Sequence, residues 1–209
     1  MHSYMMLFPI FRASGWWGEI LNGAVYTSAE SRWASVQRSG PAVPLVYGSR
    51  DTLIFSDTGR RLLLENCHLP GIQFKEARYM TIYDIPWDKW DMNREYPPWL
   101  DTHNYEEPDD YWQHARELTP AEIACMEASW ELVPPAIEAE VSWISDMQLS
   151  KRLGSSFYFK AEPSVEKQGV YYAGNRVKDL IVDSKTAKQL QRMFDKWVEF
   201  EPILPSDAL

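Results

Sequence analysis

Cysteine is scarce in this sequence: only Cys67 and Cys125 occur in 209 residues. Each stands alone in its neighbourhood, so the paired spacing of a disulfide-stapled secreted domain is absent. Adjacent Cys67 and His68 point in different directions in regular structure, and we expect a buried thiol beside an exposed turn residue. Cysteine use of this kind is typical of a reducing compartment and predicts a cytoplasmic protein.

Long apolar runs and an excess of positive charge are also lacking. No stretch approaches the roughly 18 apolar residues that cross a bilayer. The first residues carry no basic segment and their apolar run ends at Pro9, so we expect a first strand rather than an export signal. The 21 Lys+Arg against 30 Asp+Glu give a formal charge of −9, which repels phosphate backbones and anionic bilayers on average. Nucleic acid and membrane are therefore not expected as partners.

The residue patterns of common catalytic and metal sites are missing too. The ten glycines form no phosphate-binding loop and no Gly-x-Ser-x-Gly turn. The four histidines lie far apart, without a His-x-x-x-His or Cys-x-x-Cys pair. Ser164 and Lys167 match Ser-x-x-Lys, but they follow Pro163 and precede Gln168-Gly169, a pattern typical of a turn. We therefore predict a protein that is not an enzyme and has no metal or cofactor.

What the sequence does contain is an internal similarity between residues 51–76 and residues 178–202. Each segment begins with an apolar run, Leu53-Ile54-Phe55 in the first and Leu180-Ile181-Val182 in the second. A short continuous apolar run bounded by polar residues predicts a buried strand.

Each run ends at a small polar residue, Ser56 or Asp183, whose oxygen can accept the unpaired N–H groups of a first helical turn. A leucine-containing segment of about three turns follows, the average helix length. Residues 72–75 and 197–201 then alternate between apolar and polar, which predicts a second strand. The sequence therefore predicts two pseudo-repeated strand-helix-strand units that share one core.

Two further helices are expected. Thr119-Pro120-Ala121-Glu122 matches a capping box with proline at the first helical position. Ile123, Met126, Trp130 and Val133 then recur at helical spacing until Pro134-Pro135, which predicts one helix over residues 119–133. A shorter helix is expected over residues 28–38.

Strands outnumber helices in the rest of the chain. Because the expected strands come in runs rather than alternating with helices, the sequence predicts an α+β fold with mostly antiparallel sheets and packed helices, in a single domain over residues 1–209. The strands, several of them bounded by Gly, Pro or Asn, are expected over residues 7–12, 23–27, 44–47, 156–160 and 169–172.

Residues 84–112 form an insert rich in acids, proline and aromatic side chains. It holds nine acids and two bases, so it contributes seven of the net negative charges. Interfaces concentrate binding energy in a few aromatic anchors, and surrounding charge steers a partner of opposite sign. The insert predicts either a protein-binding surface or a long loop that its own tryptophans pin to the domain. The candidate partner-binding residues are Trp87, Trp90, Asp91, Glu95, Trp99, Asp101, Glu106, Glu107, Asp109, Asp110 and Trp112.

The two similar units resemble a module that recurs in immunity proteins of bacterial polymorphic toxin systems. That module has a strand, a Ser- or Asp-capped helix rich in leucine, and a Gly-hydrophobic-x-Phe strand, matched here by Gly71-Ile72-Gln73-Phe74. Some members add a zinc ribbon with two Cys-x-x-Cys-Gly motifs; this sequence lacks them, so no zinc is carried over. The resemblance implies a small cytoplasmic protein that binds one cognate toxin domain and neutralises it.

Two other functions stay open from the sequence. Stacked indoles and paired acids also bind sugars and cations, so the insert is compatible with a small carbohydrate- or cation-ligand-binding enzyme. A structural or regulatory adaptor would differ from an immunity protein only in the identity of its partner.

If the toxin is basic, as nucleases usually are, the acidic insert would steer it or mimic its substrate.

Overall fold

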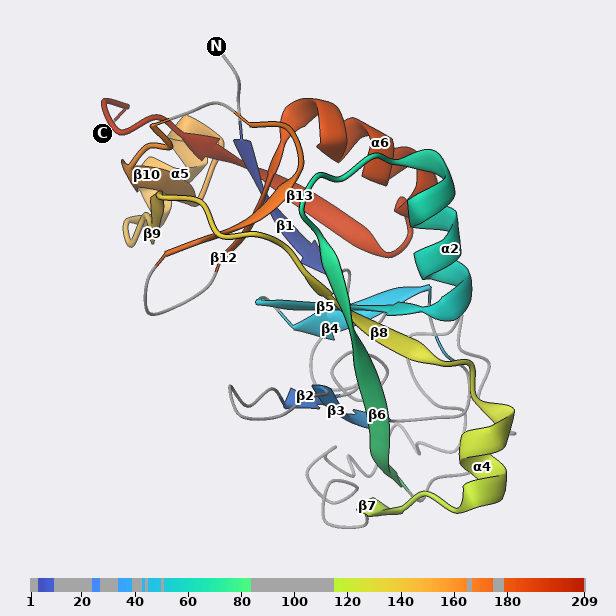
Figure 1. The fold of residues 1–209 in the computed structure, drawn as a ribbon. Helices are drawn as coiled ribbons and strands as arrows, with labels where there is room; N and C mark the ends of the chain where they lie inside the picture. The colour runs from blue at the N-terminus through green and yellow to red at the C-terminus, as the bar shows by residue number, and fades with distance from the viewer. Residues whose placement is uncertain are drawn as a thin grey trace, which may run out of the picture.

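The computed structural model describes residues 4–9, 24–26, 34–38, 43, 45–49, 51–83, 115–164, 167–174 and 179–208. Within these residues, thirteen strands form two mostly antiparallel sheets, and four helices accompany them (Figure 1). This arrangement confirms the predicted α+β class.

One sheet has six strands and the other has seven. The six-stranded sheet has the order β11 (Val170–Ala173), β12 (Asp179–Asp183), β1 (Tyr4–Pro9), β13 (Val198–Leu204), β10 (Phe157–Ala161) and β9 (Glu140–Trp143). The second has the order β2 (Ala24–Tyr26), β3 (Ala34–Arg38), β6 (Gln73–Tyr83), β8 (Ser129–Val133), β5 (Thr52–Ser56) and β4 (Val46–Ser49), and β7 (Ala115–Glu117) also pairs with β6. The helices are α2 (Asp57–Asn66), α4 (Pro120–Cys125), α5 (Met147–Leu153) and α6 (Ser184–Phe194).

Both predicted strand-helix-strand segments adopt those elements, as β5–α2–β6 and β12–α6–β13. In each, the two strands are not neighbours: β8 lies antiparallel between β5 and β6, and β1 lies antiparallel between β12 and β13. The outer strands are therefore parallel, and a helical crossover is the usual way to join parallel strands. The two units share this topology, and their origin as a repeat stays a prediction.

Both helices begin at the predicted polar residues. Ser56 Oγ accepts the N–H of Gly59 at 3.1 Å at the start of α2. Asp183 Oδ1 accepts the N–H groups of Lys185 and Thr186 at 2.9 and 3.1 Å at the start of α6. Its other oxygen, Oδ2, accepts the N–H of Gly169 at 2.6 Å. Asp183 thereby caps α6 and also ties it to the turn before β11.

The prediction of one helix over residues 119–133 is wrong beyond its first two turns. The capping box of Thr119 and Glu122 is present and α4 begins at Pro120, but the helix ends at Cys125. Residues 129–133 form the central strand β8, which pairs with β5 on one side and β6 on the other. Ladder pairing on both edges outweighs the helical spacing of the apolar residues, since the spacing carries no information about neighbouring strands.

The helix expected over residues 28–38 is also wrong where the structure describes it. Residues 34–38 form β3, which pairs with β2 and runs parallel to β6. Ala34 and Val36 are both fully buried, as one face of a strand requires. The expected strands agree with β2, β4, β10 and β11 to within two residues, and β1 begins at Tyr4, three residues before the expected strand.

The main core lies between the two units, where α2 and α6 run next to each other (Figure 1). Alternate residues of β5 face different cores: Leu53 and Phe55 belong to this shared core, whereas Ile54 packs on the far face of its sheet. Leu180 and Val182 of β12 behave in the same way. Both strands are buried on both faces, which explains their uninterrupted apolar runs.

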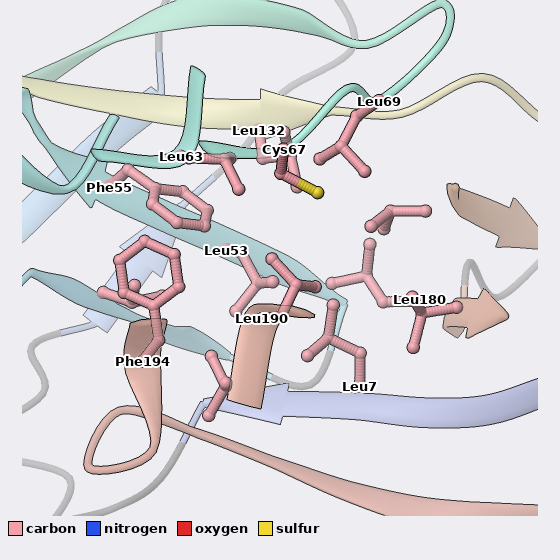
Figure 2. Packing of buried hydrophobic residues seen from close by; sticks show 14 of the residues in the cluster. Leu7, Leu53, Phe55, Leu63, Cys67, Leu69, Leu132, Leu180, Leu190 and Phe194 are labelled. Atoms are coloured by element: carbon pink, nitrogen blue, oxygen red, sulfur yellow. The ribbon is translucent and has the colours of Figure 1, made fainter. Parts of the chain in front are cut away.

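Figure 2 shows the centre of this shared core. Phe55 of β5 and Phe194 of α6 meet edge to face, with ring centroids 5.5 Å apart. Leu53 and Leu190 lie next to the rings, and Leu7 of β1 belongs to the same cluster, so side chains from both sheets contribute. The core therefore joins the two strand-helix-strand units.

Candidate functional site

All eleven candidate partner-binding residues, from Trp87 to Trp112, lie outside the described residues. The structure does describe both attachments of the insert. β6 ends at Tyr83 and β7 begins at Ala115, and these two residues are paired antiparallel partners. The chain therefore leaves the sheet and returns to it at one place. In Figure 1 this place is the end of the molecule that carries β7 and α4, far from the six-stranded sheet.

The net charge of the sequence comes from the insert and the segments that flank it. Residues 73–131, from the start of β6 to the third residue of β8, contain fourteen acidic and five basic residues, a formal charge of −9. The remaining residues hold sixteen of each sign and are neutral. Seven of these nine net negative charges belong to residues 84–112, which lie outside the described part of the chain.

An open groove of about 430 Å³ lies beside the base of the insert. It occupies a gap along one edge of β6: β8 pairs with residues 73–77 and β7 pairs with residues 81–83, and α4 borders the groove between them. The described residues that line it are Glu76, Ala77, Arg78 and Tyr79 of β6, Ile123 and Met126 of α4 and its C-cap, and Ala128, Ser129 and Trp130.

A chain of hydroxyl groups fixes the floor of the groove. Tyr47 donates to Ser129 Oγ at 2.9 Å, and Ser129 Oγ lies 2.5 Å from Tyr79 Oη. Tyr79 gives its single proton to the carbonyl of Glu127 at 2.5 Å, so Ser129 is the donor to Tyr79. The serine proton thus goes to a neutral phenol, which does not activate it as a nucleophile. We interpret this buried chain as structural.

One wall of the groove is Trp130, which is held from two sides. Its indole N–H donates to Asp57 Oδ1 at 3.1 Å, and the guanidinium of Arg60 lies 4.4 Å from its ring centroid. Arg60 also lies 5.2 Å from the ring of Phe74 and 3.6 Å from Asp57. This cation–π and hydrogen-bond arrangement fixes the orientation of the indole ring.

Helix α4 is fixed at its N-terminus by Glu122. Its carboxylate accepts the backbone N–H of Thr119 at 2.8 Å and two bonds from Arg116, at 2.6 and 3.0 Å. The Arg116 hydrogen bonds, followed by those from Thr119, lower the pKa of Glu122 to about 2. The ion pair connects β7, at the base of the insert, to the helix that borders the groove.

We expect Arg116→Ala to raise the pKa of Glu122 towards its ordinary value of 4.5. A carboxyl whose pKa is lowered on folding stabilises the native state above its unfolded-state pKa, and this contribution is lost as the pH falls towards 2. A carboxyl-detected NMR titration of Glu122 measures the shift. Arg78→Ala is the control, because Arg78 pairs with Glu76 instead; an equal shift in both variants would contradict the assignment to Arg116.

The other candidate groups do not assemble into a site in the described part of the chain. Cys67 is buried and Cys125 is exposed, and both thiols are free. Burial, followed by the carboxylate of Asp183, raises the pKa of the Cys67 thiol, and His68 is exposed, as predicted for this pair. Ser164 and Lys167 are exposed too. Residues that the structure describes include no cluster of three or more metal-ligating side chains.

No described helix combines the length and apolar character needed to cross a membrane.

Comparison with known proteins gives no family, relative or fold to which this chain can be assigned: no family model, curated protein or solved structure matches it.

Proposed function

We propose that this protein is an immunity protein that binds a cognate bacterial toxin domain and neutralises it by forming a stoichiometric complex. The observation that carries the proposal is that the whole net charge falls on residues 73–131, with seven of its nine charges in residues 84–112, a segment whose flanking residues Tyr83 and Ala115 are paired. This end of the molecule would be the surface that meets the toxin.

The physical argument concerns both rate and affinity. A field from nine net negative charges raises the association rate of a basic partner. Tryptophan and tyrosine side chains supply the desolvated contacts that dominate affinity. Residues 84–112 contain both kinds of side chain, and the paired strands β6 and β7 hold the ends of the segment together. A basic toxin domain is therefore the partner that this end fits best.

The groove does not favour the alternative of a carbohydrate-cleaving enzyme. Such enzymes need two carboxyl groups facing each other across a cleft. Among the described lining residues the groove has one carboxylate, Glu76, which is exposed and forms an ion pair of 3.1 Å with Arg78.

The experiment that tests the proposal has two steps. The purified protein is used to capture partners from its source cell, and the gene of a captured protein is then expressed in a heterologous bacterium, alone and with this chain. We expect growth arrest by the partner alone and growth when both are produced. A partner that never arrests growth would contradict neutralisation, and a glycan that raises the melting temperature when no protein is captured would favour the ligand-binding alternative.

Trp90→Ala combined with Asp91→Lys should weaken toxin binding by about 100-fold, because an aromatic hot spot contributes about 2 kcal/mol or more and the charge reversal opposes steering. Titration calorimetry at two salt concentrations measures both effects. The matched control is Trp143→Ala with Glu140→Lys, which removes an exposed indole and reverses one acid on β9 of the other sheet. Equal losses in the two variants would place the interface elsewhere.

A further inference from the structure

We propose that the groove between α4, β6 and β8 is an anchor pocket, which receives one bulky apolar side chain of the toxin that is flanked by lysine or arginine. This inference rests on the proposed function and adds the chemistry of the segment that the protein recognises. It depends on described residues that line the groove and on the charge of the sequence from residue 73 to residue 131.

The apolar part of the pocket comes from both sides. Ile123 of α4 is 42% exposed, an unusual position for an isoleucine, and it borders the groove. Met126, Ala128 and Trp130 continue the apolar surface. The volume of about 430 Å³ falls within the range of about 300–1,000 Å³ that is typical of pockets for small ligands. A leucine, methionine or aromatic side chain would cover this surface and displace water from it.

The pocket is ordered before a partner arrives. Trp130 is held by Asp57 and Arg60, and the floor is held by the hydroxyl chain through Ser129. A site that is already ordered loses little conformational entropy on binding, so more of the contact energy is retained as affinity. Hot spots typically lie in rigid pockets of this kind.

The charge around the pocket selects the flanks of the bound segment. The guanidinium groups of Arg78 and Arg116 already lie against the carboxylates of Glu76 and Glu122, at 3.1 and 2.6 Å. The described residues of this region, 73–83 and 115–131, hold five acids against three bases, a formal charge of −2, and the sequence of the insert between them adds seven more negative charges. This field attracts cationic flanks and repels acidic ones, so the occupant is a basic segment with an apolar centre.

The test uses three capped pentapeptides: two lysines on each side of a central leucine, the same peptide with a central alanine, and the leucine peptide with glutamates in place of lysines. Each is titrated into the full-length protein, and NMR follows the methyl groups of Ile123 and Met126 and the indole N–H of Trp130. The lysine–leucine peptide should shift these three signals in a saturable way. The alanine peptide should bind at least about tenfold more weakly, because it buries less apolar surface, and the glutamate peptide should not bind.

Ile123→Lys should abolish the shifts of Met126 and Trp130, because it places a cation at the mouth of the pocket. Met147→Lys is the matched control, since Met147 is 74% exposed and lies on α5, between β9 and β10 of the six-stranded sheet. Peptide binding should be unchanged in this variant. Equal binding of the leucine and alanine peptides, or of the lysine and glutamate peptides, overturns the proposal, as does binding that Ile123→Lys leaves intact. If Ile123→Lys protein still neutralises the toxin with unchanged affinity, the pocket fails while the immunity function stands.

Discussion

Replacing Gly59 by alanine is expected to lower the free energy of unfolding by about 3 kcal/mol or more, although alanine is the better helix former by about 1 kcal/mol. Gly59 lies in the first turn of α2 and is buried against the segment before β4. An added Cβ would lie 2.2 Å from the carbonyl oxygen of Leu45 and 3.0 Å from its carbon. That same oxygen accepts the N–H of Ser56 at 3.1 Å, so moving it away breaks a buried hydrogen bond. Overpacking against backbone has no side-chain rotamer to relieve it.

Chemical denaturation followed by far-UV circular dichroism measures this loss. Gly154→Ala is the matched control: Gly154 has a φ of 71° at the end of α5, and an added Cβ would have no atom within 4 Å. Its cost is confined to the left-handed backbone, about 1–2 kcal/mol. A Gly59→Ala protein as stable as the wild type would mean that α2 does not pack on Leu45 as described.

The elements that the sequence predicts well are those governed by local chemistry. Ser56 and Asp183 are small polar residues directly after apolar runs, and both cap helices at the expected positions. The Thr119–Glu122 capping box likewise marks the true start of α4. In each case the signal and the structure involve residues within one helical turn, so no knowledge of the tertiary fold is needed.

The elements that the sequence mispredicts depend on distant partners. Trp130 and Val133 continue the helical spacing of Ile123 and Met126, yet they belong to a strand because β5 and β6 supply ladder partners on both sides. The insertion of β1 between β12 and β13 brings the two ends of the chain together. Neither pairing leaves a local trace in the sequence, and proline at residues 134–135 ends a helix or a strand equally well.

The candidate site likewise has one part that the sequence predicts, the insert, and one part that it does not, the groove. The charge and aromatic content of residues 84–112 are visible in the sequence, because composition needs no fold. The groove is not visible, since it arises along one edge of β6, between the residues that pair with β8 and those that pair with β7, where α4 borders it instead of a strand. Ile123, which borders the groove and is exposed, was expected on the apolar face of a longer helix, so the sequence pattern did not point to a groove.

Phe194→Ala is expected to destabilise the protein by about 3–5 kcal/mol, the usual cost of removing a buried phenylalanine ring. Phe194 is fully buried at the last turn of α6, and its ring meets Phe55 of β5 at 5.5 Å (Figure 2). The cavity would open in the core that both sheets share, where neither unit can close it alone. Thermal and urea unfolding measure the loss, and Met147→Ala, at an exposed position, should change stability by less than about 0.5 kcal/mol.

The contact between the two rings can be separated from the cavity by a double-mutant cycle. Phe55→Ala should cost a similar amount, and the double variant should lose less than the sum, by about 0.5–1.5 kcal/mol, because the edge-to-face attraction is removed only once. Phe55 and Phe194 come from different strand-helix-strand units, so this coupling measures how strongly one unit stabilises the other. Strict additivity, or two separate unfolding transitions in the wild type, would contradict a shared core and imply that the two units fold independently.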